Sequence, residues 1–324
     1  MIDKNYHDLL HLPLLCTATA AITILLQFQD PFWSVITVIV LYTESNEHPI
    51  LKASWRLFGT IIGAIVGVML CIFLINNSAL LLLSLFIIAM ISAYCAFNTR
   101  HSYAFILGGA TCLMVIFPSW TSPSALIDVA IWRSAEVVLG VLIVTADYIL
   151  IKRNNSNNSD GAAIVSSNHF AQSLSISIGC LLTAIVCLLF SLQGGAIGII
   201  TAFVLSLIQN SGKQMIKGAE RIVGCIIGAA MGLLCLILIS HSFSSLLFII
   251  LVATFIYACF HYTHPLFPYT KLQAIVAFLV ALLPSTNILT PTIWPALERV
   301  SGILIGLVII TVLNFFLISN EPKD

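Results

Sequence analysis

The chain has 324 residues, of which 60% are hydrophobic and 8% are charged, and its mean hydropathy is +1.07. Soluble domains carry about 25% charged residues, so this composition excludes a water-soluble globular protein. The 13 basic and 13 acidic residues give no net charge, and we therefore expect no binding to nucleic acid. Twelve spanning helices of about 20 residues each would use about 240 positions. The sequence therefore predicts an all-α, polytopic integral membrane protein.

Apolar segments follow one another along the chain, with short polar stretches between them. Six precede position 152, namely 12–28, 32–42, 57–75, 79–97, 103–117 and 125–151. A polar run at 153–168 then predicts an exposed cytoplasmic linker. Six more segments follow, namely 174–192, 195–209, 222–240, 245–262, 271–283 and 293–318. We therefore expect two six-helix transmembrane regions, at 1–152 and 169–324.

Cysteine pairs and the known catalytic sequence motifs do not occur in this sequence. All nine cysteines fall inside apolar segments without a CxxC pair, so we expect them to be packing residues rather than disulfides or metal ligands. The sequence contains no HExxH helix, phosphate-binding loop, Rossmann fingerprint or GxSxG elbow. It therefore predicts no enzyme, no cofactor and no metal site.

Lysine and arginine are distributed asymmetrically between the segments. With the N-terminus in the cytoplasm, eleven of the thirteen basic residues fall on the cytoplasmic side. Only Arg133 and Arg299 then lie near the outer ends of helices. The positive-inside rule therefore predicts that both termini are cytoplasmic. Trp33 and three other tryptophans then lie near the outer interface, where an aromatic belt is expected.

The two halves of the sequence resemble each other. The residues Arg56, Gly59, Gly63 and Gly67 recur 165 positions later as Arg221, Gly224, Gly228 and Gly232. Arg133 and Gly140 recur 166 positions later as Arg299 and Gly306. Because six spans per half is an even number, both halves share one orientation, and we expect a parallel repeat with a pseudo-twofold axis along the membrane normal.

Short or interrupted segments occupy matching places in the two halves. Asp30-Pro31 precedes the second segment, and Gly194-Gly195 precedes the eighth. Such segments point to a transport pathway. They are equally compatible with tilted packing helices.

Four segments share one pattern, which begins at Arg56, Arg133, Arg221 and Arg299. Glycine follows at i+3 and i+7, except that Glu136 takes the i+3 place after Arg133. These positions lie on one helical face, and small residues let helices approach closely, so we expect the face to point into the protein. We also expect each arginine at the N-terminal end of its helix, where the dipole favours an anion.

The four arginines divide between the two sides of the predicted membrane. Arg56 and Arg221 fall on the cytoplasmic side, and Arg133 and Arg299 on the outer side, so an anion would meet positive charge at both ends of a pathway. Alternatively, Arg56 and Arg221 are anchors that reach to the interface.

Glu136 lies about one turn deeper in its helix than Arg133. Carboxylates inside spanning helices are costly and mark ion or proton pathways. Two interpretations of Glu136 remain open, namely a structural salt bridge with Arg133 and a proton-coupling carboxylate. In the second half Gly302 takes the matching position, and Glu298 stands beside Arg299. Asp147 is expected to be interfacial.

The run Pro31–Thr37, followed by the run Arg56–Gly63, resembles the fusaric acid resistance and aromatic acid exporter family. Arg133-Ser134-Ala135-Glu136 with Gly140 resembles the sixth helix of that family. The resemblance implies a bacterial inner-membrane exporter of aromatic carboxylic acids, which often works with a periplasmic adaptor protein. The plant malate channels are distant relatives with a similar membrane bundle.

Two functional hypotheses follow for small organic anions crossing the bilayer. In a proton-coupled exporter, Arg133 and Arg299 attract the carboxylate and Arg56 and Arg221 form the cytoplasmic entry. Glu136, or Glu298 in the second half, then carries the proton, and Trp33 offers an aromatic surface to the substrate ring.

In a passive organic-anion channel the same arginines create the selective field, and Glu136 is structural. A membrane scaffold without transport would leave the outer arginines unexplained. The residues do not decide between one central pathway and one pathway per repeat.

Overall fold

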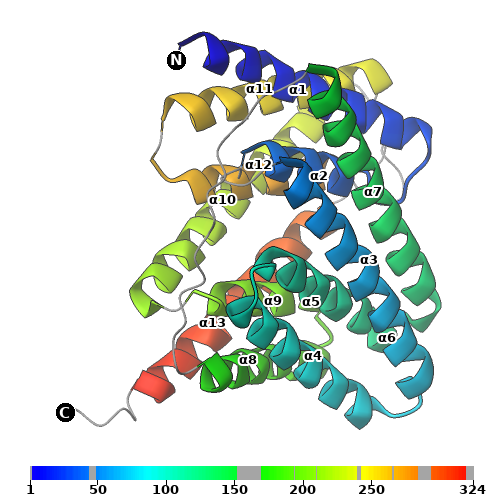
Figure 1. The fold of residues 1–324 in the computed structure, drawn as a ribbon, viewed down its shortest axis with the longest axis vertical. Helices are drawn as coiled ribbons and strands as arrows, with labels where there is room; N and C mark the ends of the chain where they lie inside the picture. Colours follow the sequence, from blue (N-terminus) through cyan, green and yellow to red (C-terminus); the bar gives the residue numbers. More distant parts are fainter. Residues whose placement is uncertain are drawn as a thin grey trace. The chain divides into compact units, whose positions relative to one another are not determined.

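The computed structural model describes residues 2–43, 49–151, 169–192, 194–208, 210–238, 242–264, 266–283 and 293–318. All regular structure within these ranges is helical. The helices before the predicted linker are α1 (Ile2–Leu25), α2 (Phe32–Thr43), α3 (Pro49–Leu74), α4 (Ser78–Asn98), α5 (Ser102–Ile116), α6 (Pro118–Thr121), the 3₁₀ helix η1 (Pro123–Ala125) and α7 (Leu126–Ile151) (Figure 1). Those after it are α8 (His169–Leu189), α9 (Gly195–Ser206), α10 (Ser211–Leu238), α11 (Phe243–Thr263), α12 (Pro268–Leu282) and α13 (Trp294–Ile318). The predicted linker at 153–168 lies outside the described residues.

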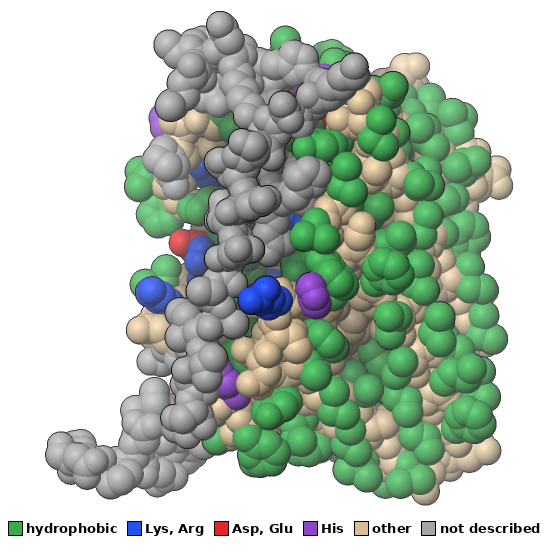
Figure 2. Space-filling model, in the orientation of Figure 1, with side chains coloured by type: hydrophobic (Ala, Val, Ile, Leu, Met, Phe, Trp, Pro, Cys, Tyr) green, Lys and Arg blue, Asp and Glu red, His purple; other side chains and the backbone are tan. Residues whose placement is uncertain are grey.

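Eight stretches of helix are long and apolar enough to cross a membrane. Four shorter apolar helices accompany them, at Leu9–Leu25, Phe32–Thr43, Gly195–Ser206 and Pro268–Leu282. Large apolar side chains are exposed, including Phe73 at 79% and Leu150 at 81%. Hydrophobic side chains accordingly cover much of the described surface in Figure 2. A soluble protein does not expose apolar surface so widely, and the chain is therefore an all-α, multi-pass membrane protein.

The helices gather into two compact units. The first comprises Met1–Leu57, Trp132–Asp160 and Val223–Ala296, and the second comprises Phe58–Ile131, Gly161–Ile222 and Leu297–Asp324. Each unit takes helices from both predicted halves of the sequence. The compact units and the sequence halves are therefore different divisions of the chain.

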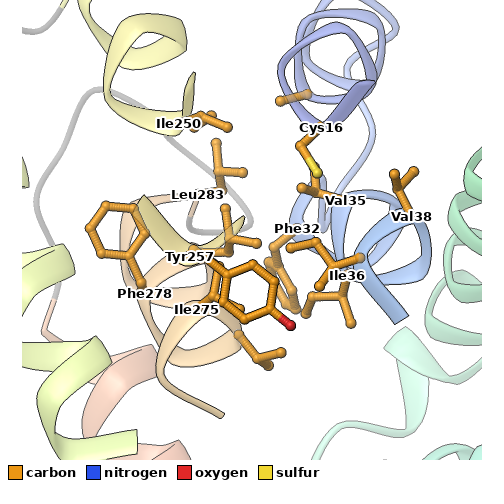
Figure 3. Close-up of a cluster of buried hydrophobic side chains, with 14 of the residues drawn as sticks. Cys16, Phe32, Val35, Ile36, Val38, Ile250, Tyr257, Ile275, Phe278 and Leu283 are labelled. Carbon is orange, nitrogen blue, oxygen red and sulfur yellow. The ribbon is translucent and has the colours of Figure 1, made fainter. Parts of the chain in front are cut away.

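In the first unit α1 packs against α11, and α2 contacts both α1 and α12. Their apolar side chains meet in one cluster, which Figure 3 shows with Cys16, Val35, Ile36, Ile250 and Tyr257 among its members. Eight of the twelve residues of α2 are buried, including the polar Ser34 and Thr37. Because α2 is enclosed, these polar side chains must find their partners inside the protein.

In the second unit α4 packs against α8, and α5 packs against α9. Leu113, Ile116, Ile199 and Phe203 are fully buried in the shared core. In both units, therefore, helices of one sequence half pack against helices of the other half.

The glycine stripes pack against neighbouring helix backbones, as the sequence predicts. A methyl group on Gly59 of α3 would lie 2.5 Å from the carbonyl oxygen of Ala104 in α5. The glycines of α10 approach α12 in the same way, and those of α13 approach α9. On α7, Gly140 lies against Ser34 and Thr37 of α2. The prediction that these faces point into the protein is confirmed.

The prediction that the arginines lie at helix N-termini is wrong. Helix α3 begins seven residues before Arg56, and α7 begins seven residues before Arg133. Arg221 is ten residues inside α10, and Arg299 is five residues inside α13. The helices extend through polar or mixed residues that the apolar segments did not include. Because the dipole effect fades beyond the first turn, any attraction for an anion comes from the guanidinium groups themselves.

Candidate functional site

The entry to α2 contacts α7 at Glu136. The backbone N–H of Asp30 donates a hydrogen bond to Oε1 of Glu136 at 2.8 Å. Ser34, one turn into α2, donates its hydroxyl proton to the backbone carbonyl oxygen of Glu136 at 2.9 Å. The absence of a side chain at Gly140 lets the two helices come this close. Glu136 is thus held in place by α2 and by the turn that precedes it.

The carboxylate of Glu136 keeps one oxygen without a partner. The side chain is 0% exposed, and its Oε2 has no hydrogen-bond partner among the described residues. Within that part of the chain no ion pair of 4.0 Å or less joins Glu136 to Arg133. The structure therefore does not show the ion pair that the salt-bridge interpretation requires. A buried carboxylate oxygen with no donor beside it is a place that a proton can occupy.

Arg133 faces an aromatic ring in place of the carboxylate. Its guanidinium carbon lies 3.5 Å from the centre of the Trp33 ring. A cation over the face of tryptophan is a favourable arrangement. The Nε and Nη1 atoms of Arg133 are buried and have no acceptor among the described residues. Trp33 therefore holds the guanidinium, while two of its nitrogens remain available for an anion.

Arg56 approaches the same helix one turn further along. Its Nε donates a hydrogen bond to Oγ1 of Thr37 at 3.2 Å, and the side chain is buried. Thr37 in turn donates to the backbone carbonyl of Trp33 at 2.9 Å. Arg56 and Arg133 are close enough to interact electrostatically. These two arginines are neighbours along α2, and they do not mark opposite ends of a pathway as expected.

Asp30 adds a second acidic group beside Glu136. It lies in the turn between α1 and α2 and is half-buried. Burial raises the pKa of Asp30 from 3.8 to about 6, although the positive charge of Arg133 opposes the shift. In the sequence, Asp30 is distinguished only by its place before a short apolar segment. Its contact with Glu136, 106 positions away, carries no local sequence signal.

The matching residues of the second half lie in the second unit. Arg221 and Arg299 are both buried there, and Glu298 is half-buried. Gly194 lies against the backbone of Glu298 and Gly302, which is the place that Asp30 and Glu136 occupy in the first unit. At these described positions the acidic pair is therefore present in the first unit and replaced by glycines in the second.

A further polar cluster, which the sequence analysis missed, joins three helices of the first unit. Tyr42 of α2 donates its hydroxyl proton to Oδ2 of Asp147 in α7. The Nδ1 atom of His11 in α1 lies 3.2 Å from the Tyr42 hydroxyl and 3.5 Å from Oδ1 of Asp147. The side chain of Asp147 is 9% exposed. Asp147, which was expected to be interfacial, is thus enclosed by Tyr42 and His11. The available sequence signal was its spacing of eleven residues from Glu136, which places both carboxylates on one helical face.

A hollow of about 270 Å³ lies between α10, α11 and α12, and its lining is apolar apart from Lys271. The ammonium group of Lys271 donates to the backbone carbonyls of Phe260, at 2.9 Å, and His264. The lysine thus donates hydrogen bonds to carbonyl groups at the C-terminal end of α11. His261 lies in the last turn of that helix.

Comparison with known families agrees with the motifs around Trp33 and Arg133. Residues 15–158 match the fusaric acid resistance protein family, and residues 174–313 match a model described as fusaric acid resistance protein-like. The chain belongs to the fusaric acid resistance protein family. The resemblance that the motifs indicated is confirmed, and the two family matches divide at the predicted linker.

Individual proteins that resemble this chain match it only in part. The p-hydroxybenzoic acid efflux pump subunit AaeB of Yersinia pestis (strain Pestoides F) is 30% identical over 147 residues, which is 42% of this chain and 23% of that protein. The protein of the same name from Yersinia pseudotuberculosis serotype O:1b (strain IP 31758) matches equally well. The alignment thus spans about a quarter of the length of these relatives. No solved structure matches the chain.

Proposed function

We propose that this protein is a bacterial inner-membrane exporter of aromatic carboxylic acids that couples export to proton movement, and not an enzyme. Its family membership and the efflux-pump name of the Yersinia relatives support export of an aromatic acid. The observation that carries the proposal is the site on α2 and α7. It combines a buried guanidinium with free N–H groups, an aromatic ring beneath it and a buried carboxylate with a free oxygen.

Each group in this site has a distinct task in the proposed mechanism. Arg133 binds the substrate carboxylate through its unpaired N–H groups, and Arg56 adds positive charge nearby. Trp33 orients the guanidinium and offers an aromatic face to the substrate ring. Glu136 accepts the coupling proton on Oε2. We assign coupling to Glu136 rather than Glu298, because the matching glycines leave Glu298 without a comparable acidic neighbour.

We further propose that twelve crossing helices form two parallel six-helix repeats, 1–152 and 169–324, with both termini in the cytoplasm. Helices at matching places have matching lengths, with 12 residues in α2 and α9, 21 in α4 and α11, and 15 in α5 and α12. The packing of α1 with α11 also has its counterpart in the packing of α8 with α4. In the proposed repeat Arg221 and Arg299 line the equivalent surface. A periplasmic adaptor stays a prediction.

Transport in proteoliposomes tests this function. Benzoate flux is measured with and without an imposed pH gradient for wild type, Glu136→Gln and Arg133→Gln. Asp128→Asn is the matched control, because Asp128 is an exposed acid on the same helix. We expect uphill benzoate movement in wild type and the control, downhill flux alone in Glu136→Gln, and neither in Arg133→Gln.

The alternative is a passive anion channel, in which Glu136 has no role in coupling. Downhill flux that ignores both the pH gradient and Glu136→Gln would establish that alternative. Absence of flux for any aromatic acid would refute transport of this substrate class.

A further inference from the structure

We propose that His11, Tyr42 and Asp147 form a second proton-binding site, which exchanges protons in series with Glu136 along α7. This inference rests on the proposed proton coupling. The three side chains come from α1, α2 and α7, and Nδ1 of His11 lies 3.2 Å from the Tyr42 hydroxyl and 3.5 Å from Oδ1 of Asp147. Carboxylates within spanning helices are costly and commonly mark proton or ion pathways, and this one lies between a hydroxyl and an imidazole.

The position of Asp147 on α7 relates it to Glu136. Eleven residues correspond to about three helical turns and about 16 Å along the axis, so both carboxylates lie on one face of the helix. Gly140 lies on this face between them and packs against Thr37 of α2. The same two helices thus hold one acid site near each end of their contact, with Ser34 at one acid and Tyr42 at the other.

The geometry of the cluster allows a proton to pass through it. Tyr42 donates its hydroxyl proton to Oδ2 of Asp147, and its oxygen can accept a proton from Nδ1 of His11. When imidazolium forms at His11, Nδ1 gives its proton to the Tyr42 oxygen, and Tyr42 gives its own proton to Asp147. The products are neutral imidazole, an intact phenol and a protonated carboxyl group.

Other titratable groups surround the cluster on the neighbouring helices. Those in the described part of the chain are Lys52 of α3, whose ammonium donates to the carbonyl of Val40; Tyr148, next to Asp147 on α7; Tyr257 of α11, whose hydroxyl lies 3.5 Å from Thr43; and His261 of α11, whose ring lies 5.6 Å from that of Tyr257. The contacts with Asp147 come from His11 and Tyr42, and the proposed proton exchange runs through these two groups.

The sequence repeat supplies an independent argument. On the helix that carries Arg299, the position 166 residues after Asp147 holds the apolar Leu313, and the same offset relates Arg133 to Arg299 and Glu136 to Gly302. A carboxylate that only stabilised the bundle would be equally useful in either half. Asp147 and the acidic pair Asp30–Glu136 are instead all present in the first half and replaced in the second.

Infrared difference spectroscopy of the full-length protein in nanodiscs, recorded between acid and neutral pH without substrate, tests proton binding directly. Glu136 and Asp30 also contribute carboxyl bands, so wild type and the control Asp128→Asn should show one carboxyl component that Asp147→Asn lacks. His11→Gln should lose the share of the imidazole bands that His11 contributes beside the other seven histidines, and Tyr42→Phe, which keeps the ring, should shift the Asp147 component. A carboxyl difference spectrum of Asp147→Asn that equals that of wild type would overturn the proposal.

Transport of benzoate by the same variants tests the series arrangement. Asp147→Asn should lose gradient-driven transport but retain downhill flux, as Glu136→Gln does. Retained gradient-driven transport in Asp147→Asn together with its loss in Glu136→Gln would overturn the second site and leave the proposed function intact. Absence of gradient-driven transport in wild type would refute the proposed function and the series role together, while the infrared bands still decide whether the cluster binds a proton.

Discussion

Gly140→Ala is the most direct test of whether close contact between α2 and α7 maintains the site. The added methyl group would lie 2.7 Å from Cβ of Thr37 and 2.8 Å from the carbonyl oxygen of Ser34. Ordinary van der Waals contact begins at 3.4 Å, and the difference from 2.7 Å means that α2 must retreat by about 0.7 Å. Both neighbours lie close to or within the α2 backbone, so a simple side-chain rotation does not relieve the clash.

That displacement is large enough to disconnect Glu136. Asp30 lies two residues before α2, and when it moves with that helix along the hydrogen bond, the distance from its backbone nitrogen to Oε1 of Glu136 lengthens from 2.8 Å to about 3.5 Å, which is the outer limit of a hydrogen bond. Overpacking of this kind costs about 1–3 kcal/mol of stability. We therefore expect a lower thermal midpoint and loss of gradient-driven benzoate transport.

Gly179→Ala is the matched control for this experiment. Its methyl group would meet only Cδ1 of Leu313, at 3.4 Å, and should leave both measurements unchanged. Thermal unfolding is followed by size-exclusion fluorescence, and transport is measured in proteoliposomes. Equal midpoints and equal transport for Gly140→Ala and Gly179→Ala would refute the argument that this contact positions the carboxylate.

The remaining predictions concern the ring, the acid and the thiols. Trp33→Leu removes a cation–π contact worth about 0.5–2 kcal/mol and should weaken benzoate binding by about two- to thirtyfold, with a smaller loss in Trp33→Phe; calorimetry that finds unchanged affinity would exclude a role for the ring. Because the pKa of Asp30 is raised from 3.8 to about 6, the folded state holds a proton that the unfolded state releases, so stability should fall as the pH rises through this window. Asp30→Asn should flatten that dependence of the thermal midpoint, and an identical slope would contradict it. All nine cysteines are free, so a reducing agent should leave the thermal midpoint unchanged, whereas a decrease would reveal a disulfide.

Membrane character and the packing faces could be predicted because they depend on local patterns. A spanning helix satisfies its backbone hydrogen bonds within one segment, so apolar runs such as 79–97 predicted α4 closely. The glycine spacing after Arg56 likewise indicates a packing face from helical geometry alone. Helix ends were less predictable, because the helices continue through mixed residues such as those before Arg56.

The members of the candidate site were partly predictable, and their pairings were not. The sequence identified Arg133, Glu136 and Trp33 individually, and it left open whether Glu136 forms a salt bridge with Arg133 or couples protons. The structure instead pairs Arg133 with Trp33 and pairs Glu136 with the backbone of Asp30. Side-chain direction and the register between two helices decide such pairings, and neither is encoded in the spacing along one helix.

The sequence by itself determined that this chain is an all-α membrane protein of the fusaric acid resistance family with glycine-lined helix faces. Hydropathy, helical periodicity and family motifs are properties of contiguous residues, and they survive without knowledge of the partners. Only the tertiary structure decided that α1 packs against α11 and that Arg56 and Arg133 both contact side chains of α2. It also decided that His11, Tyr42 and Asp147 meet. These contacts join positions far apart in the chain, and they form only when several helices pack together in one register.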